Sequence, residues 1–320
     1  MKRRSGEMKI GSAVAKPGSA AKGYFNGGYM PDGQEVRVPV FIANGAKEGP
    51  ALWVQAAIHG YEFEGTLAIH EIIRRVRPAE LSGRLVLVPA LNIPSFITRE
   101  RFSWLDEQDM NRQFPGSPDG SYTQQLAHKL LDLVAEHCDY AADMHSGGWH
   151  GQVGTWVIYA GKEEGLELAK KWGHKVLFTP KEGELKGRTF YSACAERGVP
   201  ALLTEYGGLG TPWAETVASN ARGIWNLLQG LGMVPGKPEL PASYQHVTDW
   251  VQIYSHRGGL FLPEVKVDDV VKNGQKLGRI VDLFGDTVEE IQSRDDGVMV
   301  GIVQNPVVSS GERVMQIGRF

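Results

Sequence analysis

The alternation of strand-like and helix-like segments over residues 36–92 limits the fold more than any other feature of the sequence. Two short apolar runs, at 38–43 and 51–58, are rich in strand formers. Residues 65–76 carry apolar side chains at the i, i+3, i+4, i+7 spacing of an amphipathic helix, and the run at 83–90 is continuous enough for a strand buried on both faces. This order predicts an α/β domain with functional groups at the carboxyl ends of its strands.

Residues 92–120 are polar, contain Pro94, Pro115 and Pro118, and show no sustained period, so we expect a long ordered loop. Long loops inside a compact domain are usually functional. The elements expected beyond it are a helix at 121–137, a strand at 139–145, a helix at 166–173, a buried strand at 199–205 and a helix at 211–231.

The pattern changes after residues 232–241, a run of glycines, prolines and other turn residues that we interpret as a linker. In the tail, residues 270–280 and 307–317 share the form V-V-x-x-G-x-x-[L/V]-x-x-I, and an Asn-Gly turn suggests that each copy is one β-hairpin. The repeat resembles the biotinyl/lipoyl-type barrel sandwich, but the turn at 295–298 lacks the modifiable lysine of a carrier domain. We therefore predict a domain at 1–240, flexible or weakly ordered over 1–23, and a small all-β domain at 241–320 able to cover a cleft in the first.

The composition excludes several classes of function. Of 320 residues, 42% are hydrophobic and 22% are charged, the formal net charge is -3, and no Lys/Arg run is present, so neither a nucleic acid nor a membrane is an expected partner. The N-terminus lacks the apolar core of a signal peptide, and no segment reaches the roughly 20 apolar residues of a membrane-spanning helix. Cys138 and Cys194 have no CxxC spacing, which favours a reducing compartment. We expect a cytoplasmic protein that acts on a small molecule or a short peptide.

His59 and Glu62 follow one predicted strand and precede a helix, where a spacing of three residues lets both side chains converge on one point. A catalytic zinc site uses three nitrogen or carboxylate ligands and leaves a fourth position for water. The best candidate for the third ligand is His145, at the end of a second strand, where Asp143 points to the same side and can orient the imidazole. His150 lies near a glycine-rich loop and stays undecided. Any lone histidine fits a structural role, which we assign to the others: His70, His128, His137, His174, His246 and His256.

Two further motifs offer groups for substrate binding and proton transfer. Asn111 and Arg112 in the long loop place an amide beside a guanidinium, which suits recognition of a carboxylate. Glu205 stands at a third strand end, where a carboxylate near a metal-bound water can accept its proton. Each residue alone fits a surface or salt-bridge role, so the prediction depends on their combination with the histidines.

Four motifs carry a family resemblance. In order along the chain, H-G-x-E at 59–62, N-R-x-F-P-G at 111–116, D-x-H-S-G-G at 143–148 and T-E-Y-G-G at 204–208 resemble the motifs of the succinylglutamate desuccinylase/aspartoacylase family, a branch of the zinc carboxypeptidase superfamily. The similarity runs from about residue 36 to the C-terminus. It implies a zinc-carboxypeptidase-like mixed sheet flanked by helices, followed by the small barrel-sandwich-like β domain.

The resemblance also implies a mechanism. His59, Glu62 and His145 would hold one Zn²⁺ per chain, and Glu205 would be the general base and acid. The metal would lower the pKa of a water that it binds, Glu205 would take the proton, and the water would attack an amide carbonyl directly. No covalent intermediate is needed.

The substrate groups follow from the same resemblance. Asn111 and Arg112 would bind the substrate carboxylate. Arg101 falls where similar sequences have an arginine that polarises the scissile carbonyl or binds a second carboxylate, and Arg99 is the alternative for this position.

The leading prediction is therefore a zinc-dependent amidohydrolase or deacylase that cleaves an N-acyl amino acid. The alternative is a metallocarboxypeptidase that releases a C-terminal residue from a peptide. A non-catalytic binding or carrier protein is disfavoured because the ligand set and Glu205 are complete, and a serine mechanism lacks a G-x-S-x-G elbow at Ser146, which we expect to be a loop hydrogen-bonder. The acyl group, the metal used in the cell and the formation of a homo-oligomer stay open.

Overall fold

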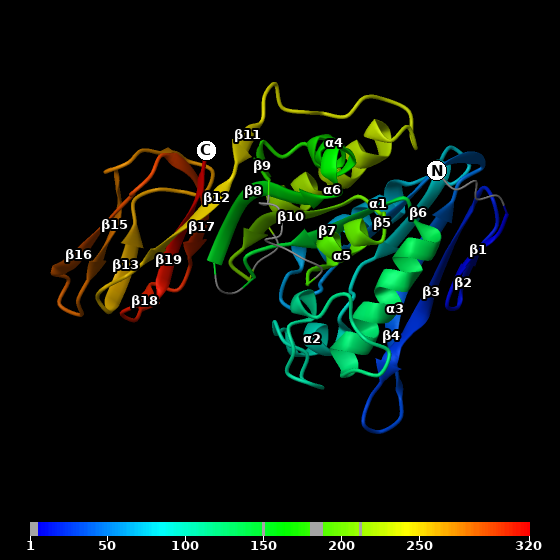
Figure 1. Cartoon of the computed structure of the whole chain (residues 1–320), viewed down its shortest axis with the longest axis horizontal. Coiled ribbons are helices and arrows are strands. Elements are labelled where there is room, and N and C mark those ends of the chain that lie inside the picture. The colour runs from blue at the N-terminus through cyan, green and yellow to red at the C-terminus, as the bar shows by residue number, and fades with distance from the viewer. Residues whose placement is uncertain (1–5, 149–150, 180–187, 211–212) are drawn as a thin grey trace.

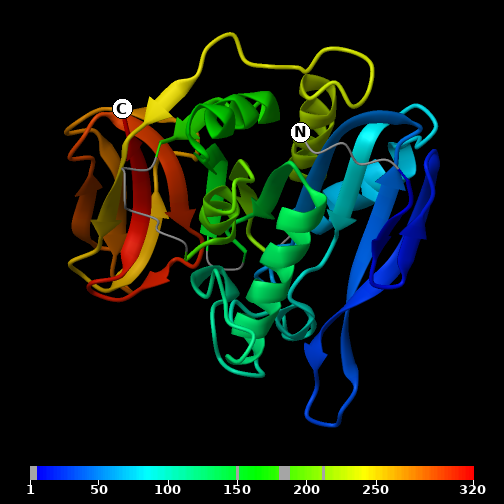
Figure 2. The same ribbon diagram turned by 45° about the vertical axis from the view of Figure 1, so that its right-hand side comes forward.

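The computed structural model describes residues 6–148, 151–179, 188–210 and 213–320. Its main feature is one large mixed β-sheet with helices packed on both faces (Figure 1). The C-terminal strands, orange to red, lie at one end of the molecule and the N-terminal strands, blue, at the other, as Figure 2 also shows. The predicted α/β fold with a β-rich C-terminal region is confirmed.

The middle of the large sheet is parallel. Its strand order is β12-β19-β17-β8-β10-β7-β5-β6-β4-β3. The strands are β3 (Ser19–Tyr29), β4 (Glu35–Asn44), β5 (Lys47–Ala56), β6 (Ser82–Val88), β7 (Tyr140–His145), β8 (Gly151–Ala160), β10 (Ala201–Gly208), β12 (Asp249–Tyr254), β17 (Gly297–Val303) and β19 (Arg313–Arg319), with β9 (Val176–Phe178), β11 (Gln245–Val247) and β14 (Val270–Val271) attached at the side. Strands β10, β7, β5 and β6 are parallel neighbours, whereas β8 and β4 pair antiparallel with them. The carboxyl ends of the parallel strands therefore meet at one edge.

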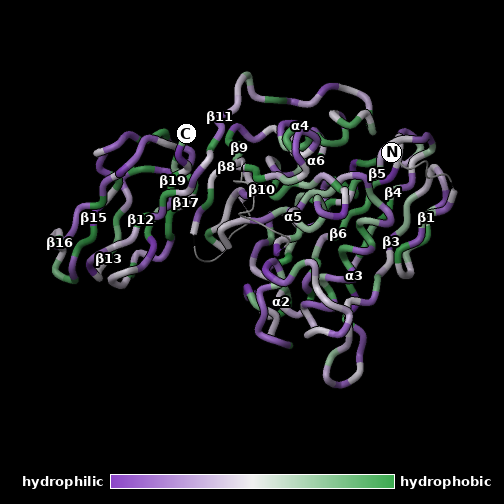
Figure 3. The backbone as a smooth tube through the Cα atoms, in the orientation of Figure 1, coloured by the Kyte–Doolittle hydropathy of each residue, from purple (hydrophilic) through white to green (hydrophobic). Residues whose placement is uncertain are grey.

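Helices cover both faces of this sheet. Helices α1 (Glu64–Arg75), α4 (Lys162–Trp172) and α6 (Ala214–Gly230) pack on one face, and α3 (Tyr122–His137) and α5 (Phe190–Glu196) on the other. Leu52 and Trp53 in β5 are fully buried on opposite faces, and Figure 3 shows hydrophobic residues along the strands of the sheet. The continuous apolar runs predict this double burial. In the described part of the chain, no helix is both long and apolar enough to cross a bilayer.

The segment at 92–120 contains two short helices that the sequence does not predict. They are α2 (Ile93–Thr98) and the 3₁₀ helix η1 (Met110–Arg112). Both are too short to show a helical period. Helix α2 packs so closely on the end of β5 that a Cβ at Gly60 would clash with the Ser95 carbonyl, which explains the glycine after His59.

Residues 8–29 form three strands, so the expectation of a flexible stretch over 1–23 is wrong for its described part. Strand β1 (Met8–Ile10) pairs antiparallel with β2 (Ala13–Ala15), and β3 follows from Ser19. The inward side chains of this hairpin are buried in the main core, whereas Lys9 and Val14 face outward. Small residues such as alanine signal strand weakly, and here burial against the core supplies the stability.

The two copies of the C-terminal repeat do not form hairpins, contrary to expectation. Strand β14 of the first copy pairs with β17 in the large sheet, whereas β15 (Lys276–Val281) joins β13 (Gly259–Pro263) and β16 (Thr287–Gln292) in a four-stranded sheet. In the second copy, β18 (Val307–Val308) belongs to the four-stranded sheet and β19 to the large one. Each copy therefore crosses between sheets, at turns where Gly274 and Gly311 have positive φ.

The large sheet also joins the two predicted domains. Strand β17 pairs with β8, so the sheet continues from the α/β part into the C-terminal part. The division at residue 240 stays a prediction about the chain.

The N-terminal hairpin provides a test of its own packing. Ile10→Ala removes a side chain that is 1% exposed, and we expect it to lower the free energy of unfolding by about 2–5 kcal/mol because a cavity remains. Val14→Ala, at a position 42% exposed in the paired strand, should cost less than about 0.5 kcal/mol. Urea denaturation measures both variants, and equal losses would show that the hairpin does not pack on the core.

His174, one of the histidines predicted to be structural, is buried. Its Nδ1 lies 3.2 Å from Thr204 Oγ1, and its Nε2 has no hydrogen-bond partner in the described ranges of the chain. Burial, assisted by the charge of Arg222, lowers the pKa of His174 to about 4. The folded protein therefore keeps this imidazole neutral at pH values where an exposed histidine is protonated.

This shift makes stability depend on pH. Between the folded pKa of about 4 and the ordinary value of 6.5, the unfolded chain binds a proton at His174 that the folded chain does not. The contribution of neutral His174 to the free energy of unfolding is therefore fully present above pH 6.5 and is lost as the pH falls toward 4. His174→Gln should flatten the pH dependence of the free energy of unfolding by up to about 1.4 kcal/mol per pH unit. Urea denaturation at several pH values measures the slope. A variant with the parent's slope would mean that His174 titrates as an exposed histidine does.

Candidate metal centre and active site

Four of the predicted site residues meet at the carboxyl edge of the parallel strands. His59 and Glu62 follow β5 directly, and His145 is the last residue of β7. Glu205 in β10 lies beside His145 in the parallel register. The sheet thus brings together residues that are far apart in the sequence.

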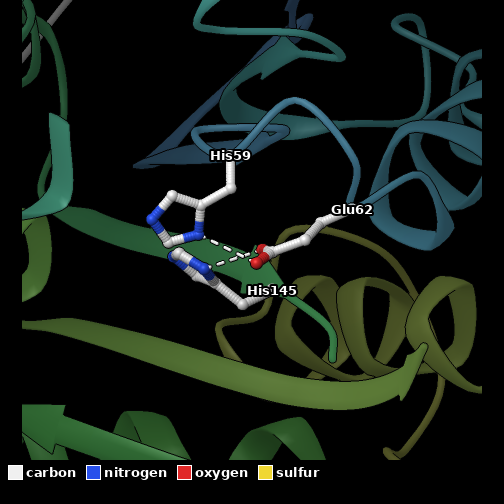
Figure 4. Close-up of side chains that lie close together, drawn as sticks. All are labelled: His59, Glu62 and His145. Atoms are coloured by element: carbon white, nitrogen blue, oxygen red, sulfur yellow. Dashed lines mark hydrogen bonds and ion pairs between the residues drawn. The ribbon is translucent and has the colours of Figure 1, made fainter. Parts of the chain in front are cut away.

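The Glu62 carboxylate contacts both imidazoles from one side, one oxygen to each ring (Figure 4). Its Oε1 is 2.8 Å from His59 Nδ1, and its Oε2 is 2.9 Å from His145 Nδ1. All three residues are buried, and one ligand atom from each lies within 4.8 Å of the others. Two imidazole nitrogens and a carboxylate oxygen are the ligand set of a catalytic zinc site. This group can bind a metal ion.

The outer nitrogen of each imidazole faces a second carboxylate. His59 Nε2 is 3.1 Å from Asp109 Oδ1, and His145 Nε2 is 3.0 Å from Asp143 Oδ2. A divalent cation can bind at the inner nitrogens and Glu62, while the contacts of the outer nitrogens with Asp109 and Asp143 keep the two rings oriented. The donor set therefore fits a divalent ion.

The pKa values of the buried groups reflect these contacts. Burial alone would raise the pKa of Glu62, but His59 and His145 hold it well below its usual range. Burial alone would lower the pKa of His145, but the charges of Asp143 and Glu62 raise it well above the ordinary value. Each group keeps its charge because its neighbours carry the opposite one.

Asp109 belongs to the site, although the sequence analysis does not single it out. It accepts hydrogen bonds from His59, from the Asn111 backbone N–H at 2.9 Å and from Arg101 Nε at 3.0 Å. Burial would raise the pKa of Asp109, but His59 and then Arg101 hold it well below its usual range. One sequence feature could have pointed to Asp109: it lies two residues before the site residue Asn111, just as Asp143 lies two residues before His145.

The structure brings Arg101 to the site and leaves Arg99 outside it. One edge of the Arg101 guanidinium is held by Asp109, and its Nη1 lies 3.5 Å from Tyr61 Oη. Arg99 lies at the C-terminal end of α2 and is exposed. Arg101 is half-buried, and its remaining N–H groups can bind an oxygen of a ligand.

Asn111 and Arg112 lie beside the histidines, but Asn111 is more constrained than expected. Its Oδ1 accepts a hydrogen bond of 2.9 Å from the Phe190 backbone N–H, and its Nδ2 is 3.3 Å from His145 Nε2. Arg112 is exposed, and its Nη1 donates to the Asn111 carbonyl at 2.8 Å. The Asn111 amide therefore connects the long loop to α5, and Arg112 offers most of its guanidinium to a ligand.

Glu205 has a buried carboxylate oxygen, Oε2, that has no hydrogen-bond partner among the residues that the structure describes. Burial raises the pKa of Glu205 to about 8, although the charge of His145 opposes the shift. Trp156, directly opposite in β8, has a buried Nε1 that also lacks a partner within the described part of the chain. A bound molecule can supply partners for such atoms.

Glu64 is a second residue that the sequence analysis misses. Ser146 Oγ donates to Glu64 Oε2 at 2.8 Å, and the Gly208 N–H donates to Glu64 Oε1 at 2.8 Å. Glu64 thus ties the loop after β7 to the end of β10, and Ser146 is a loop hydrogen-bonder as predicted. The only sequence signal for this role is a second carboxylate two residues after Glu62. His150 lies outside the described residues.

Known proteins are similar to this chain in sequence and in fold. The family model described as the succinylglutamate desuccinylase/aspartoacylase catalytic domain matches residues 48–231. The N-alpha-acetyl-L-2,4-diaminobutyric acid deacetylase of Halomonas elongata is 30% identical over 295 residues, which cover 88% of this chain and 85% of the relative. A succinylglutamate desuccinylase/aspartoacylase crystal structure from Rhodobacter sphaeroides has a TM-score of 0.82 at 28% identity, covering 94% of this chain and 95% of that one. The product-bound ectoine utilization protein EutE (DoeB) from Ruegeria pomeroyi has a TM-score of 0.83 at 24% identity, covering 99% and 96%, and shares the fold.

The site predicts that a divalent metal stabilises the folded protein. Zn²⁺ at about one hundred times its Kd should raise the free energy of unfolding by about 2.7 kcal/mol, because the unfolded chain does not assemble the three ligands. Glu62→Ala should lose both the bound metal and this stabilisation, whereas His246→Ala, at an exposed position, should keep both. Elemental mass spectrometry and thermal unfolding, before and after chelation, measure these effects. A parent protein that neither holds zinc nor is stabilised by it would contradict the site.

Proposed function

Because the chain belongs to the succinylglutamate desuccinylase/aspartoacylase family, we propose that it is a zinc-dependent deacylase that hydrolyses the amide bond of a small N-acyl amino acid. The observation that carries the proposal is the buried group of His59, Glu62 and His145 beside Glu205, whose Oε2 is unpaired. Three ligands and a neighbouring proton acceptor are what metal-assisted amide hydrolysis needs.

In this proposal His59, Glu62 and His145 hold one Zn²⁺ per chain. When bound, zinc supplies a Lewis acid that polarises a carbonyl and acidifies water. Asp109 and Asp143 orient the two imidazoles through their outer nitrogens, at 3.1 and 3.0 Å. The burial of this group keeps bulk water away and strengthens each electrostatic contact within it.

Glu205 is the proposed general base and acid. Its free Oε2 can accept a proton from the attacking water and return it to the leaving nitrogen. Burial raises the pKa of this carboxyl to about 8, and a bound cation would lower it toward neutrality by its charge. A group that titrates near the working pH can perform both transfers.

Arg101, Asn111 and Arg112 are the proposed substrate-binding groups. Asp109 fixes one edge of the Arg101 guanidinium, so the other edge can bind a carbonyl or carboxylate oxygen without a large loss of side-chain entropy. Arg112 lies exposed beside Asn111 and suits the carboxylate of an amino acid. A small amide that bears a carboxylate matches this set.

The relative from Halomonas elongata supports an N-acetyl amino acid as the substrate, since it is a deacetylase of N-alpha-acetyl-L-2,4-diaminobutyric acid. A pocket of about 740 Å³ is lined by Gly147, which follows His145 by two residues, by Gly151, and by Tyr254 and Arg313 of the C-terminal region. We propose that residues 241–320 border the cleft and limit the size of what enters. A restricted entrance favours a deacylase over a carboxypeptidase.

The proposed location in the cell rests on the two cysteines. Cys138 and Cys194 are buried free cysteines, which fits a reducing compartment, and the proposed location is the cytoplasm. The proposed partner is the small-molecule substrate.

Substitution of the proposed base tests the mechanism. Glu205→Gln should lower kcat by about 10²–10⁴-fold and keep the parent's zinc content, because the amide cannot accept the proton but does not touch the ligands. Glu71→Gln, on the exposed side of α1, should keep the parent's kcat. Amine release from N-acetyl amino acids, N-succinyl amino acids and dipeptides measures the activity.

This panel of substrates distinguishes a deacylase from a carboxypeptidase. Release from N-acetyl or N-succinyl amino acids and not from dipeptides is the expected outcome. Hydrolysis of dipeptides alone would replace the deacylase by a carboxypeptidase. A zinc-loaded parent that hydrolyses none of these compounds would overturn the proposal.

A further inference from the structure

A pair of apolar side chains stands out of the protein at the tip of the β15–β16 hairpin. Leu283 and Phe284 are 87% and 94% exposed, more than any other large hydrophobic residue in the described part of the chain. Single exposed apolar residues are common, but two neighbours that project into water at a hairpin tip keep the full cost of apolar hydration. Such a tip is typical of a surface that another molecule covers.

Hydrogen bonds within the turn fix the shape of the tip. The Asp282 carboxylate accepts hydrogen bonds from the backbone N–H of Phe284 at 2.9 Å and of Asp286 at 3.0 Å, and the Asp282 N–H donates to the Asp286 carbonyl at 2.9 Å. These bonds hold Leu283 and Phe284 away from the rest of the protein. A shape fixed before contact loses little conformational entropy when a partner binds.

A pocket with an apolar lining, which could accept such a tip, lies among β3, β4 and α1. It has a volume of about 460 Å³, and its apolar floor includes Phe41, Ile73 and Pro89. Lys22 and Arg74 stand exposed at its rim. The pocket offers an apolar cavity ringed by positive charge, which suits an apolar group flanked by negative charge.

The charges around the pocket and the tip have opposite signs. Among the described residues, neither Lys22 nor Arg74 has a carboxylate partner. Burial lowers the pKa of His70 in the same pocket, and the charges of Arg74 and Lys22 add to the shift, so the local field is positive. On the tip, Asp282 and Asp286 flank the two apolar residues.

The two surfaces lie at opposite ends of the molecule. Strands β15 and β16 are at one end of the long axis, and β3 and β4 lie toward the other (Figure 1). In two copies placed antiparallel about a two-fold axis, the end that carries the tip in each copy lies beside the end that carries the pocket in the other. Both contacts then form at once and close the assembly.

We propose that the tip formed by Leu283 and Phe284 inserts into the pocket lined by Phe41, Ile73 and Arg74 of a second copy, giving a two-fold dimer with two such contacts. Leu283 and Phe284 fill the apolar cavity. Asp286 pairs with Arg74 and Lys22 at the rim.

Truncation of the tip tests the apolar contact. The parent should sediment as a dimer, and Leu283→Ser or Phe284→Ser should raise the dimer Kd by at least about a hundredfold, since each change acts in both contacts. Neither side chain packs within its own chain, so thermal unfolding of the monomer should not change. Val307→Ser, at a position 63% exposed in β18, is the matched control and should keep the parent's Kd. A parent that stays monomeric, or tip variants that dimerise as the parent does, would overturn the proposal.

A charge exchange tests the pairing of tip with pocket. Asp286→Arg and Arg74→Glu should each weaken the dimer by about tenfold or more, because each places like charges together in both contacts. The two changes combined in one chain should restore much of the affinity. A double variant that dimerises more weakly than either single variant would show that these surfaces do not meet.

Discussion

The contact of the Glu62 carboxylate with two imidazoles is the interaction on which the rest of the site depends. A carboxylate removed from water is costly unless opposite charge and hydrogen bonds surround it, and His59 and His145 provide both. Each imidazole is held in turn by a further carboxylate, and Arg101 neutralises one of these. Polar contacts therefore extend outward from Glu62 through the two imidazoles to Asp109 and Asp143, and loss of one member would remove a contact from its buried neighbour.

The fold supports this cluster through strand ends and one long loop. The parallel register of β5, β7 and β10 aligns residues from three distant segments at a single edge. The loop at 92–120 places Asp109 beside His59. The Asp109 carboxylate is the N-cap of η1, and the same carboxylate contacts the His59 imidazole and orients it. A local turn and a ligand position are thus maintained by one side chain.

The sequence predicts the parts of the fold and site that have a local signal. The apolar runs at 51–58 and 83–90 form buried strands, and His59, Glu62 and His145 stand together at motif positions. Asp109 and Glu64 act through contacts 50 and 82 residues away, and no local pattern encodes such contacts. The N-terminal hairpin is missed because its alanines gain stability from burial, and the C-terminal repeat is misjudged because a glycine turn can join two sheets as well as two paired strands.

The pairing of β8 has a consequence for synthesis on the ribosome. Its first residues pair with β17 and its later residues with β9, which pairs in turn with β11. A nascent chain that ends after β10 contains the histidines, Glu205 and β9, but it lacks β17 and β11, so the first residues of β8 and the outer side of β9 have no partner strand. Unpaired backbone groups on an edge strand attract other chains, so protection from aggregation waits for the last part of the chain to be translated.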